Sequence, residues 1–185
     1  MARAKKGAES KQATIICVDE SGFYPLPGVV RTYAPVSETP VLREWTTRSH
    51  LSVLSGITPE GRCFFHIRER SMNSEDVIRF LKHLLRRVSG KMLVVWDGAM
   101  IHRSRTVREF LATGATRRLQ LERLPGYAPD LNPDEGIWNY LKNVELRNCC
   151  CRDLLELKEE LVKAIKRLRH RTDVIKGCFS GAGLN

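Results

Sequence analysis

One stretch constrains the fold of this chain more than any other. Residues 91–98, KMLVVWDG, form a continuous apolar run that ends in Asp97. A run that is apolar on both faces is typical of a central strand covered by helices on each side. The preceding stretch, residues 73–88, repeats its apolar positions with a helical period and predicts an amphipathic helix. Together the two stretches predict an α/β architecture.

The remaining elements follow from the same patterns. We expect strands at residues 13–23, 50–58, 62–70 and 117–125, helices at 104–114 and 152–171, and a further helix after Asn132. The stretch at 24–45 holds four prolines and predicts a connection or an edge strand. Early strands followed by alternating helices and strands predict a mixed five-stranded sheet flanked by helices.

The length of 185 residues is typical of one domain. We expect a disordered basic tail at residues 1–12, because this stretch is small, polar and without period. Residues 13–175 are expected to form the folded domain, and residues 176–185, with their glycines, a loose C-terminal tail.

The charge of the chain points to a polyanionic partner. Lys and Arg number 31 against 21 acids, a net charge of +10. Such a surface favours nucleic acid, although a solvated basic surface without that partner would have the same composition. No apolar run is long enough for a membrane span, so we expect no membrane contact and a cytoplasmic location.

The six cysteines do not predict a zinc site. They include the run Cys149-Cys150-Cys151 but no C-x-x-C pair. Adjacent residues of a helix point in different directions, so this run cannot close on one metal ion. We therefore expect reduced, mostly buried thiols.

Three acids occupy related places in the predicted fold. Asp19 ends the first strand, Asp97 ends the strand at 91–98, and functional sites gather at such strand ends. The stretch LPGYAPDLNPDEGIWNYLK, residues 124–142, would deliver a third acid at the start of a helix. Asp134, Glu135 and the nearby Asp130 are all candidates, and helical geometry does not choose among them.

A shared site for three carboxylates requires a cation between them. Oxygen ligands favour a hard ion such as Mg²⁺ or Mn²⁺. A pair of such ions about 4 Å apart can activate water and stabilise the leaving oxygen in phosphodiester cleavage. Basic residues would hold the nucleic-acid backbone while the carboxylates hold the metal.

Three motifs carry a family resemblance. VDESGF at residues 18–23, VVWDGAMIHRS at 94–104 and the stretch at 124–142 occur in this order. Together they resemble the catalytic core of bacterial insertion-sequence transposases in the mariner-like superfamily. These are DDE transposases with a ribonuclease H-like fold. The third motif is the most specific, and the resemblance extends from residue 14 to about residue 145.

The resemblance implies roles for individual residues. Asp19 and Asp97 match the two metal-ligating aspartates, and Glu135 matches the closing glutamate. Two Mg²⁺ or Mn²⁺ ions are implied as cofactors. The remaining expectations are that His102 lies near the site, that Trp138 belongs to the core, and that DNA contacts come from Arg103, Arg105 and Lys142.

The resemblance also implies partners and a reaction. The substrate would be double-stranded DNA, both element ends and target, cleaved and then joined by strand transfer. A homodimer on DNA is expected. Members of this family usually have helix-turn-helix modules ahead of the catalytic core, whereas here the first core strand begins about a dozen residues into the chain. The chain is therefore expected to be either a catalytic half whose helix-turn-helix partner is separately encoded, or a truncated copy. The alternatives are a ribonuclease H-like nuclease without transposition and a non-catalytic, DNA-binding remnant.

Overall fold

The computed structural model describes residues 13–26, 35–37, 49–97, 104–114, 117–125 and 129–183. Within them, one five-stranded sheet has the order β3-β2-β1-β4-β5. Its strands are β1 (Ala13–Phe23), β2 (Leu51–Ile57), β3 (Cys63–Arg68), β4 (Lys91–Trp96) and β5 (Leu119–Arg123). β1 pairs antiparallel with β2 and parallel with β4, so the sheet is mixed, as predicted.

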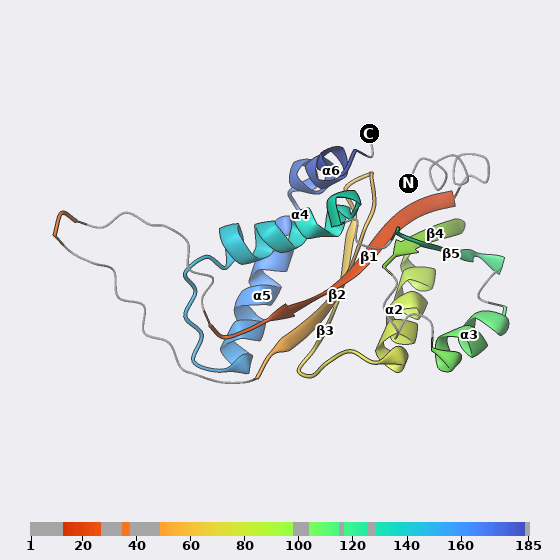
Figure 1. The fold of residues 1–185 in the computed structure, drawn as a ribbon, viewed down its shortest axis with the longest axis horizontal. Helices are drawn as coiled ribbons and strands as arrows, with labels where there is room; N and C mark the ends of the chain where they lie inside the picture. The colour runs from red at the N-terminus through yellow and green to blue at the C-terminus, as the bar shows by residue number, and fades with distance from the viewer. Residues whose placement is uncertain are drawn as a thin grey trace.

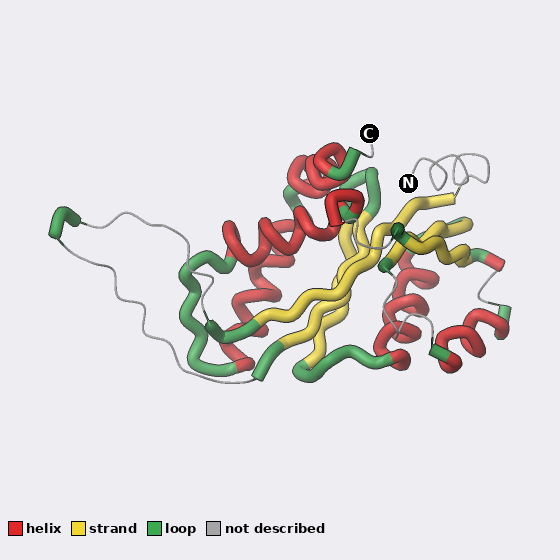
Figure 2. Tube along the Cα trace, viewed as in Figure 1, coloured by secondary structure: helices red, strands yellow, loops and turns green. Residues whose placement is uncertain are grey.

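Helices cover both faces of the sheet (Figure 1). α2 (Ser74–Arg87) and α3 (Arg105–Ala112) pack on one face. The other face carries α4 (Pro133–Tyr140), α5 (Leu154–Leu168) and α6 (Thr172–Gly181). A short 3-10 turn, η3 (Pro129–Leu131), precedes α4, and a π-helical turn, η4 (Leu141–Glu145), continues it. Figure 2 shows the strands as one layer between these two groups of helices.

The alternation of side chains divides the core into two clusters. On β1, Ile16 and Val18 face α2, whereas Cys17 faces the helices of the other side. β4 lies between β1 and β5, and all its residues from Met92 to Trp96 are buried, as the apolar run predicted. Each large aliphatic side chain buried in this way stabilises the fold by roughly 1.5–3 kcal/mol.

Both ends of α2 are fixed by specific hydrogen bonds. Asn73 caps the first turn, and its side chain and that of Asp76 bond to each other's backbone N–H groups in a capping box. At the other end, the Arg118 guanidinium donates to the carbonyl oxygens of Leu85 and Gly90. Arg118 precedes β5, so it holds the end of α2 to the edge of the sheet.

The expectation of a loose tail at residues 176–185 is wrong for residues 176–181, which belong to α6. Ile175 and Phe179 of this helix are 0% and 3% exposed and pack into the core. Burial of these side chains outweighs the low helix propensity of the glycines, on which the prediction rested. The helix predicted at 152–171 is also shorter and ends at Leu168.

Some predictions fall outside the described residues, namely the basic tail at 1–12 and most of the proline-rich stretch at 24–45. The other predicted strands and helices agree with the structure to within a few residues at each end. Of the helices described, none combines the length and apolar character that crossing a bilayer requires.

Candidate active site

Two of the three predicted acids are neighbours in the sheet. β1 and β4 run parallel, and their last paired residues are Val18 and Trp96. Asp19 and Asp97 are the next residues along each strand, so the strand register places them side by side. Val18 packs towards α2, and because side chains alternate along a strand, Asp19 points towards the face that carries α4.

A tryptophan from α4 holds the Asp19 carboxylate. The indole Nε1 of Trp138 donates to Oδ2 of Asp19 at 2.8 Å. Both residues are largely buried, with exposed fractions of 4% and 9%. The Trp138 ring also packs edge-on against Phe23, with 6.0 Å between ring centroids. Trp138 is therefore a core residue, as predicted. It is also a hydrogen-bond donor to Asp19, which the sequence did not indicate.

Glu135 lies on the first turn of α4, one turn before Trp138. The helix begins as predicted: Asn132 is the N-cap, and its side chain accepts from the backbone N–H of Asp134 at 3.2 Å, with Pro133 in the first turn. The Glu135 side chain is exposed. It also borders a cleft of about 550 Å³ between α4 and α6.

Asp134 points in the opposite direction, into the protein. Its side chain is fully buried, and the Ser55 hydroxyl donates to its Oδ1. Ser55 lies opposite Asp19 in the pairing of β1 with β2, so the hydrogen bond from Ser55 holds Asp134 close to Asp19. Burial, and then the charge of Asp19, raise the pKa of Asp134 well above its usual range. Burial thus distinguishes Asp134 from Glu135, which helical geometry could not do.

The electrostatics of Asp19 show that the acids share one environment. The pKa of Asp19 is raised to about 6, chiefly by burial and also by the charges of Glu135 and Asp97. Hydrogen bonds from Trp138 and from the backbone N–H of Glu20 act in the opposite direction. Repulsion among carboxylates favours a cation at this position.

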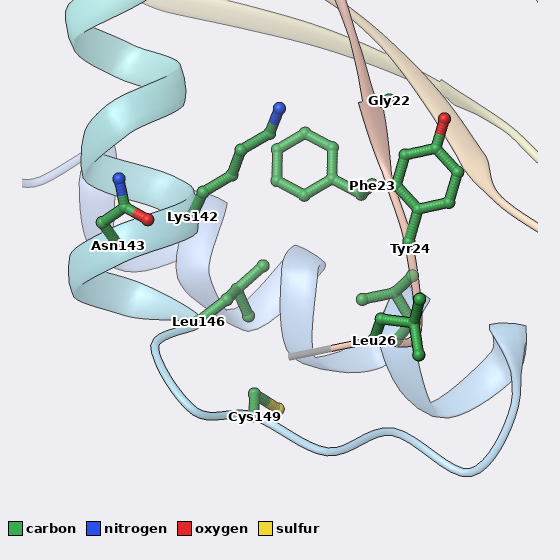
Figure 3. Close-up of a pocket in the computed structure, with 9 residues that line it drawn as sticks. Gly22, Phe23, Tyr24, Leu26, Lys142, Asn143, Leu146 and Cys149 are labelled. Carbon is green, nitrogen blue, oxygen red and sulfur yellow. The ribbon is translucent and has the colours of Figure 1, made fainter. Parts of the chain in front are cut away.

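Lys142 approaches the same centre from η4. Its Nζ donates to the Ser21 hydroxyl at 2.8 Å and lies 5.2 Å from the centroid of the Phe23 ring. Burial lowers the pKa of Lys142, and the charges of Glu135 and Asp19 raise it. Figure 3 shows the ammonium group beside Phe23, at the rim of a cleft of about 290 Å³. The ammonium group of Lys142 is therefore held near Asp19 and Glu135 and does not extend into solvent.

The other predicted site residues are less informative. Arg105, the first residue of α3, is highly exposed, and its Nε lies 2.6 Å from Oε1 of Glu109. His102 and Arg103 belong to residues 98–103, which lie outside the described residues. Asp130 is exposed and borders the same cleft as Glu135.

The donor chemistry of the site fits a hard divalent cation, since Asp19, Asp97 and Glu135 offer only carboxylate oxygens. As the side chains stand in the described part of the chain, no three His, Cys, Asp or Glu are grouped closely enough to hold a metal ion. Asp97 and Glu135 are both exposed to solvent, from which a metal ion would arrive. All six cysteines are free thiols.

The network around Ser55 is the part of the site that sequence reasoning missed. A signal was present, because Ser55 is one of two serines in the strand LSVLSGI, which is buried along its whole length. A buried hydroxyl requires a hydrogen-bond partner, and Asp134 provides it. The sequence did not identify that partner, which is 79 positions away.

The fold and the acids at its strand ends define the class of α/β domain that carries a functional site where its strands end. Residues 14–158 match the family model described as DDE superfamily endonuclease, and the chain belongs to this family. No curated protein sequence matches the chain.

Solved structures share the fold. The chain superimposes on the Mos1 mariner paired-end complex with Mn at a TM-score of 0.63 and 17% identity, covering 98% of this chain and 59% of that chain. The catalytic domain of Mos1 mariner transposase gives a TM-score of 0.57 at 15% identity, with 98% and 87% covered. An intasome of simian T-cell lymphotropic virus, in complex with PP2A regulatory subunit B56 gamma, gives 0.52 at 12% identity, with 82% and 46% covered.

These likenesses confirm the predicted ribonuclease H-like fold, which transposase and integrase catalytic domains share. The chain spans about three-fifths of the Mos1 chain in the paired-end complex, with 59% covered. It corresponds in extent to the catalytic domain, of which 87% is covered.

Proposed function

We propose that this chain is a transposase catalytic domain that cleaves DNA at transposon ends and transfers the freed strand into target DNA, using divalent metal ions. The observation that carries the proposal is the shared environment of three carboxylates, in which Asp97 and Glu135 both raise the pKa of Asp19. Membership of the DDE endonuclease family supports the same chemistry. The resemblance of its three motifs to bacterial insertion-sequence transposases supports assigning this chain to that branch.

Asp19, Asp97 and Glu135 would hold the metal. Two Mg²⁺ or Mn²⁺ ions would supply activation of the attacking oxygen and neutralisation of charge on the phosphodiester. Trp138 fixes Oδ2 of Asp19 through its N–H group and so orients this carboxylate. Lys142 places a positive charge beside the acids, where it would contact a phosphate next to the cleaved bond. His102 is proposed near the site, and Arg103 and Arg105 as DNA contacts.

The proposed partners follow from the reaction. Double-stranded DNA is the substrate, both as element ends and as target, and the chain would act on it at the nucleoid, in the cytoplasm. Pairing two ends implies a homodimer on DNA. Recognition of the ends is assigned to helix-turn-helix modules in a separately encoded half. Solved Mos1 structures include a paired-end complex with Mn and a strand transfer complex, which supports DNA as the substrate.

The test is nicking of supercoiled plasmid in the presence of Mg²⁺ or Mn²⁺. Asp97→Asn should reduce nicking at least about 100-fold, because a ligand at the reacting centre is lost. DNA binding should remain, since the substitution removes a negative charge. Asp130→Asn is the matched control and should retain activity. Asp130 is an exposed acid of η3 that borders the same cleft as Glu135. Undiminished nicking by Asp97→Asn would sink the proposal.

A second assay separates transposition from simple cleavage. A short duplex with a pre-cut 3′-OH end is incubated with plasmid and Mn²⁺, and joined products are counted. A transposase domain yields joined products that depend on Glu135 and Asp19. A nuclease without transposition would cut the plasmid and join nothing, and a non-catalytic remnant would bind DNA and do neither.

A further inference from the structure

A buried carboxylate on the opposite face of the sheet collects three guanidinium groups. Asp76, in the first turn of α2, has a side chain that is 0% exposed. Nη1 of Arg70 lies 2.7 Å from its Oδ2, and Nε of Arg68 lies 3.2 Å from its Oδ1. Nη1 of Arg79 completes the set at 3.5 Å from Oδ1. We call Arg68, Arg70 and Arg79 the arginine cluster.

The cluster has more positive charge than the fold needs. Among the described residues, the acids that act on its three guanidinium groups are Asp76, the exposed Glu75, which lies 3.8 Å from Nη2 of Arg79, and Glu69, which pairs with Lys158. His66 is also 3.8 Å from Asp76, and burial lowers the pKa of its ring, which favours the neutral form. Residues 62–87 as a whole carry seven Lys and Arg against three acids. Neutralising one buried carboxylate would require a single guanidinium.

The guanidinium groups remain accessible while their anchor is not. The side chains of Arg68, Arg70 and Arg79 are 33%, 46% and 54% exposed. Each guanidinium has five N–H donors, so two carboxylate oxygens occupy only a few of those available. Nη1 of Arg70 donates in addition to the carbonyl oxygen of Ser71. Asp76 thus holds the three planar groups in place, and they offer further donors to a ligand.

Such an arrangement suits phosphate. Arginine clusters bind phosphate oxygens through bidentate, charge-assisted hydrogen bonds, and preorganised guanidinium groups lose little freedom on binding. Asp19 points towards α4, whereas Arg68 points towards α2, so the cluster lies across the sheet from the candidate active site. A phosphate bound there belongs to a stretch of DNA outside the reacting bond.

We propose that the arginine cluster is a second DNA-binding site, which holds the backbone of a duplex away from the cleaved phosphodiester. The proposal rests on the proposed function for its choice of DNA as partner. Asp76 is a positioning residue in this site: it orders the guanidinium groups and does not itself contact DNA.

The test measures the salt dependence of binding to a 30-base-pair duplex of arbitrary sequence, in EDTA, so that no chemistry occurs. Each phosphate contact contributes about 0.9 to the slope of log K against log salt. Arg79→Gln leaves two partners on Asp76 and should lower the slope by about 1, with binding several-fold weaker. Arg79→Lys keeps the charge and should keep most of the slope.

Removing all three arginines would leave Asp76 buried without a partner, so the triple Gln variant is made in an Asp76→Asn background. It is compared with Asp76→Asn alone, and its slope should be lower by about 3. Arg152→Gln is the matched control, because Arg152 is 77% exposed, pairs with Glu156 in the first turn of α5 and carries the same charge. Its slope should stay near the wild-type value.

Two results would overturn the inference. The arginine cluster is purely structural if its variants unfold more easily but keep the slope of Arg152→Gln. It recognises acidic protein if a polyglutamate peptide binds as tightly as the duplex and is weakened by the same variants. Plasmid nicking is scored separately: a chain that never nicks but shows the slope change retains this site, and a chain that nicks without the slope change lacks it.

Discussion

The ionisation of Asp19 affects both the proposed chemistry and the stability of the fold. Asp19 is nearly buried, faces two other carboxylates, and is held by one indole N–H. Burial and repulsion favour its protonated form, whereas the hydrogen bonds favour the ionised form that a metal requires. A bound divalent cation would reverse the balance, so the same side chain should respond to both pH and metal.

This balance predicts a pH dependence of stability in the absence of divalent cations. The pKa of Asp19 is about 6 in the folded chain, whereas the ordinary pKa of an aspartate, expected in the unfolded chain, is 3.8. The folded state therefore binds the proton more tightly, and the stability gained is present below pH 3.8 and lost as the pH rises through about 6. The loss should be on the order of 3 kcal/mol.

Urea denaturation followed by circular dichroism, at a series of pH values with EDTA, measures this effect. Asp19→Asn cannot titrate at this position and should lack the corresponding fall in the free energy of unfolding. Asp134 titrates in the same direction and its pKa is raised by the charge of Asp19, so the difference between the two proteins measures Asp19 together with its effect on Asp134. Equal pH dependence in the two proteins would contradict the assignment.

The choice between adjacent acids shows where sequence reasoning stops at this scale. The pattern Asn-Pro-Asp-Glu predicted a helix start and an acid near its first turn, and both are present. Which acid faces the site depends on how α4 is rotated against the sheet. That rotation is set by burial of Ile137 and Trp138 and by the bond from Ser55 to Asp134, contacts with distant strands that no local pattern encodes.

At the scale of elements, the contact between α4 and α6 depends on one glycine. A Cβ added at Gly136 would lie 2.7 Å from Sγ of Cys178, closer than real side chains approach. Gly136 follows Glu135 directly, so the position of α6 also determines how the start of α4 presents its acid. A helix that the sequence suggested was a loose tail thus supports the candidate site.

Gly136→Ala should therefore destabilise the fold by about 1–3 kcal/mol, the usual effect of overpacking. Gly177→Ala on α6 is the matched control: nothing lies within 4 Å of its added Cβ, and higher helix propensity should make it neutral or slightly stabilising. Thermal unfolding of both variants gives the comparison. The double variant Gly136→Ala with Cys178→Ala should recover part of the loss, and a loss unchanged by the second substitution would exclude this contact as the cause.

Predictability also differed among elements for a physical reason. The sequence predicted β4 and α2 closely because burial is visible in their apolar patterns. β4 is a continuous apolar run because both of its faces are buried, and α2 has one apolar stripe because only one of its faces is buried. α6 was missed because its two core side chains, Ile175 and Phe179, are separated by glycine and polar residues. Its helical state depends on packing against α4 and α5, which the sequence of the segment alone does not reveal.

At the scale of the whole molecule, the candidate site exists only in the assembled fold. Asp19, Asp97 and Glu135 come from β1, from the end of β4 and from α4, and α4 packs against the two strands in one of the core clusters. A metal ion shared by them would link these elements, and its binding energy would appear as stability of the entire domain. Unfolding would separate the ligands and release the ion.

Magnesium should therefore raise the free energy of unfolding, by about 2.7 kcal/mol at a hundredfold excess over its dissociation constant. Denaturation in MgCl₂ is compared with denaturation in NaCl of equal ionic strength, which removes the general effect of salt. Glu135→Gln should lose most of the stabilisation, whereas Asp134→Asn, a change at the adjacent but buried acid, should retain it. The reverse result would assign the third ligand to Asp134. Equal stabilisation of wild type, Asp97→Asn and Glu135→Gln would show that magnesium binds elsewhere on the molecule.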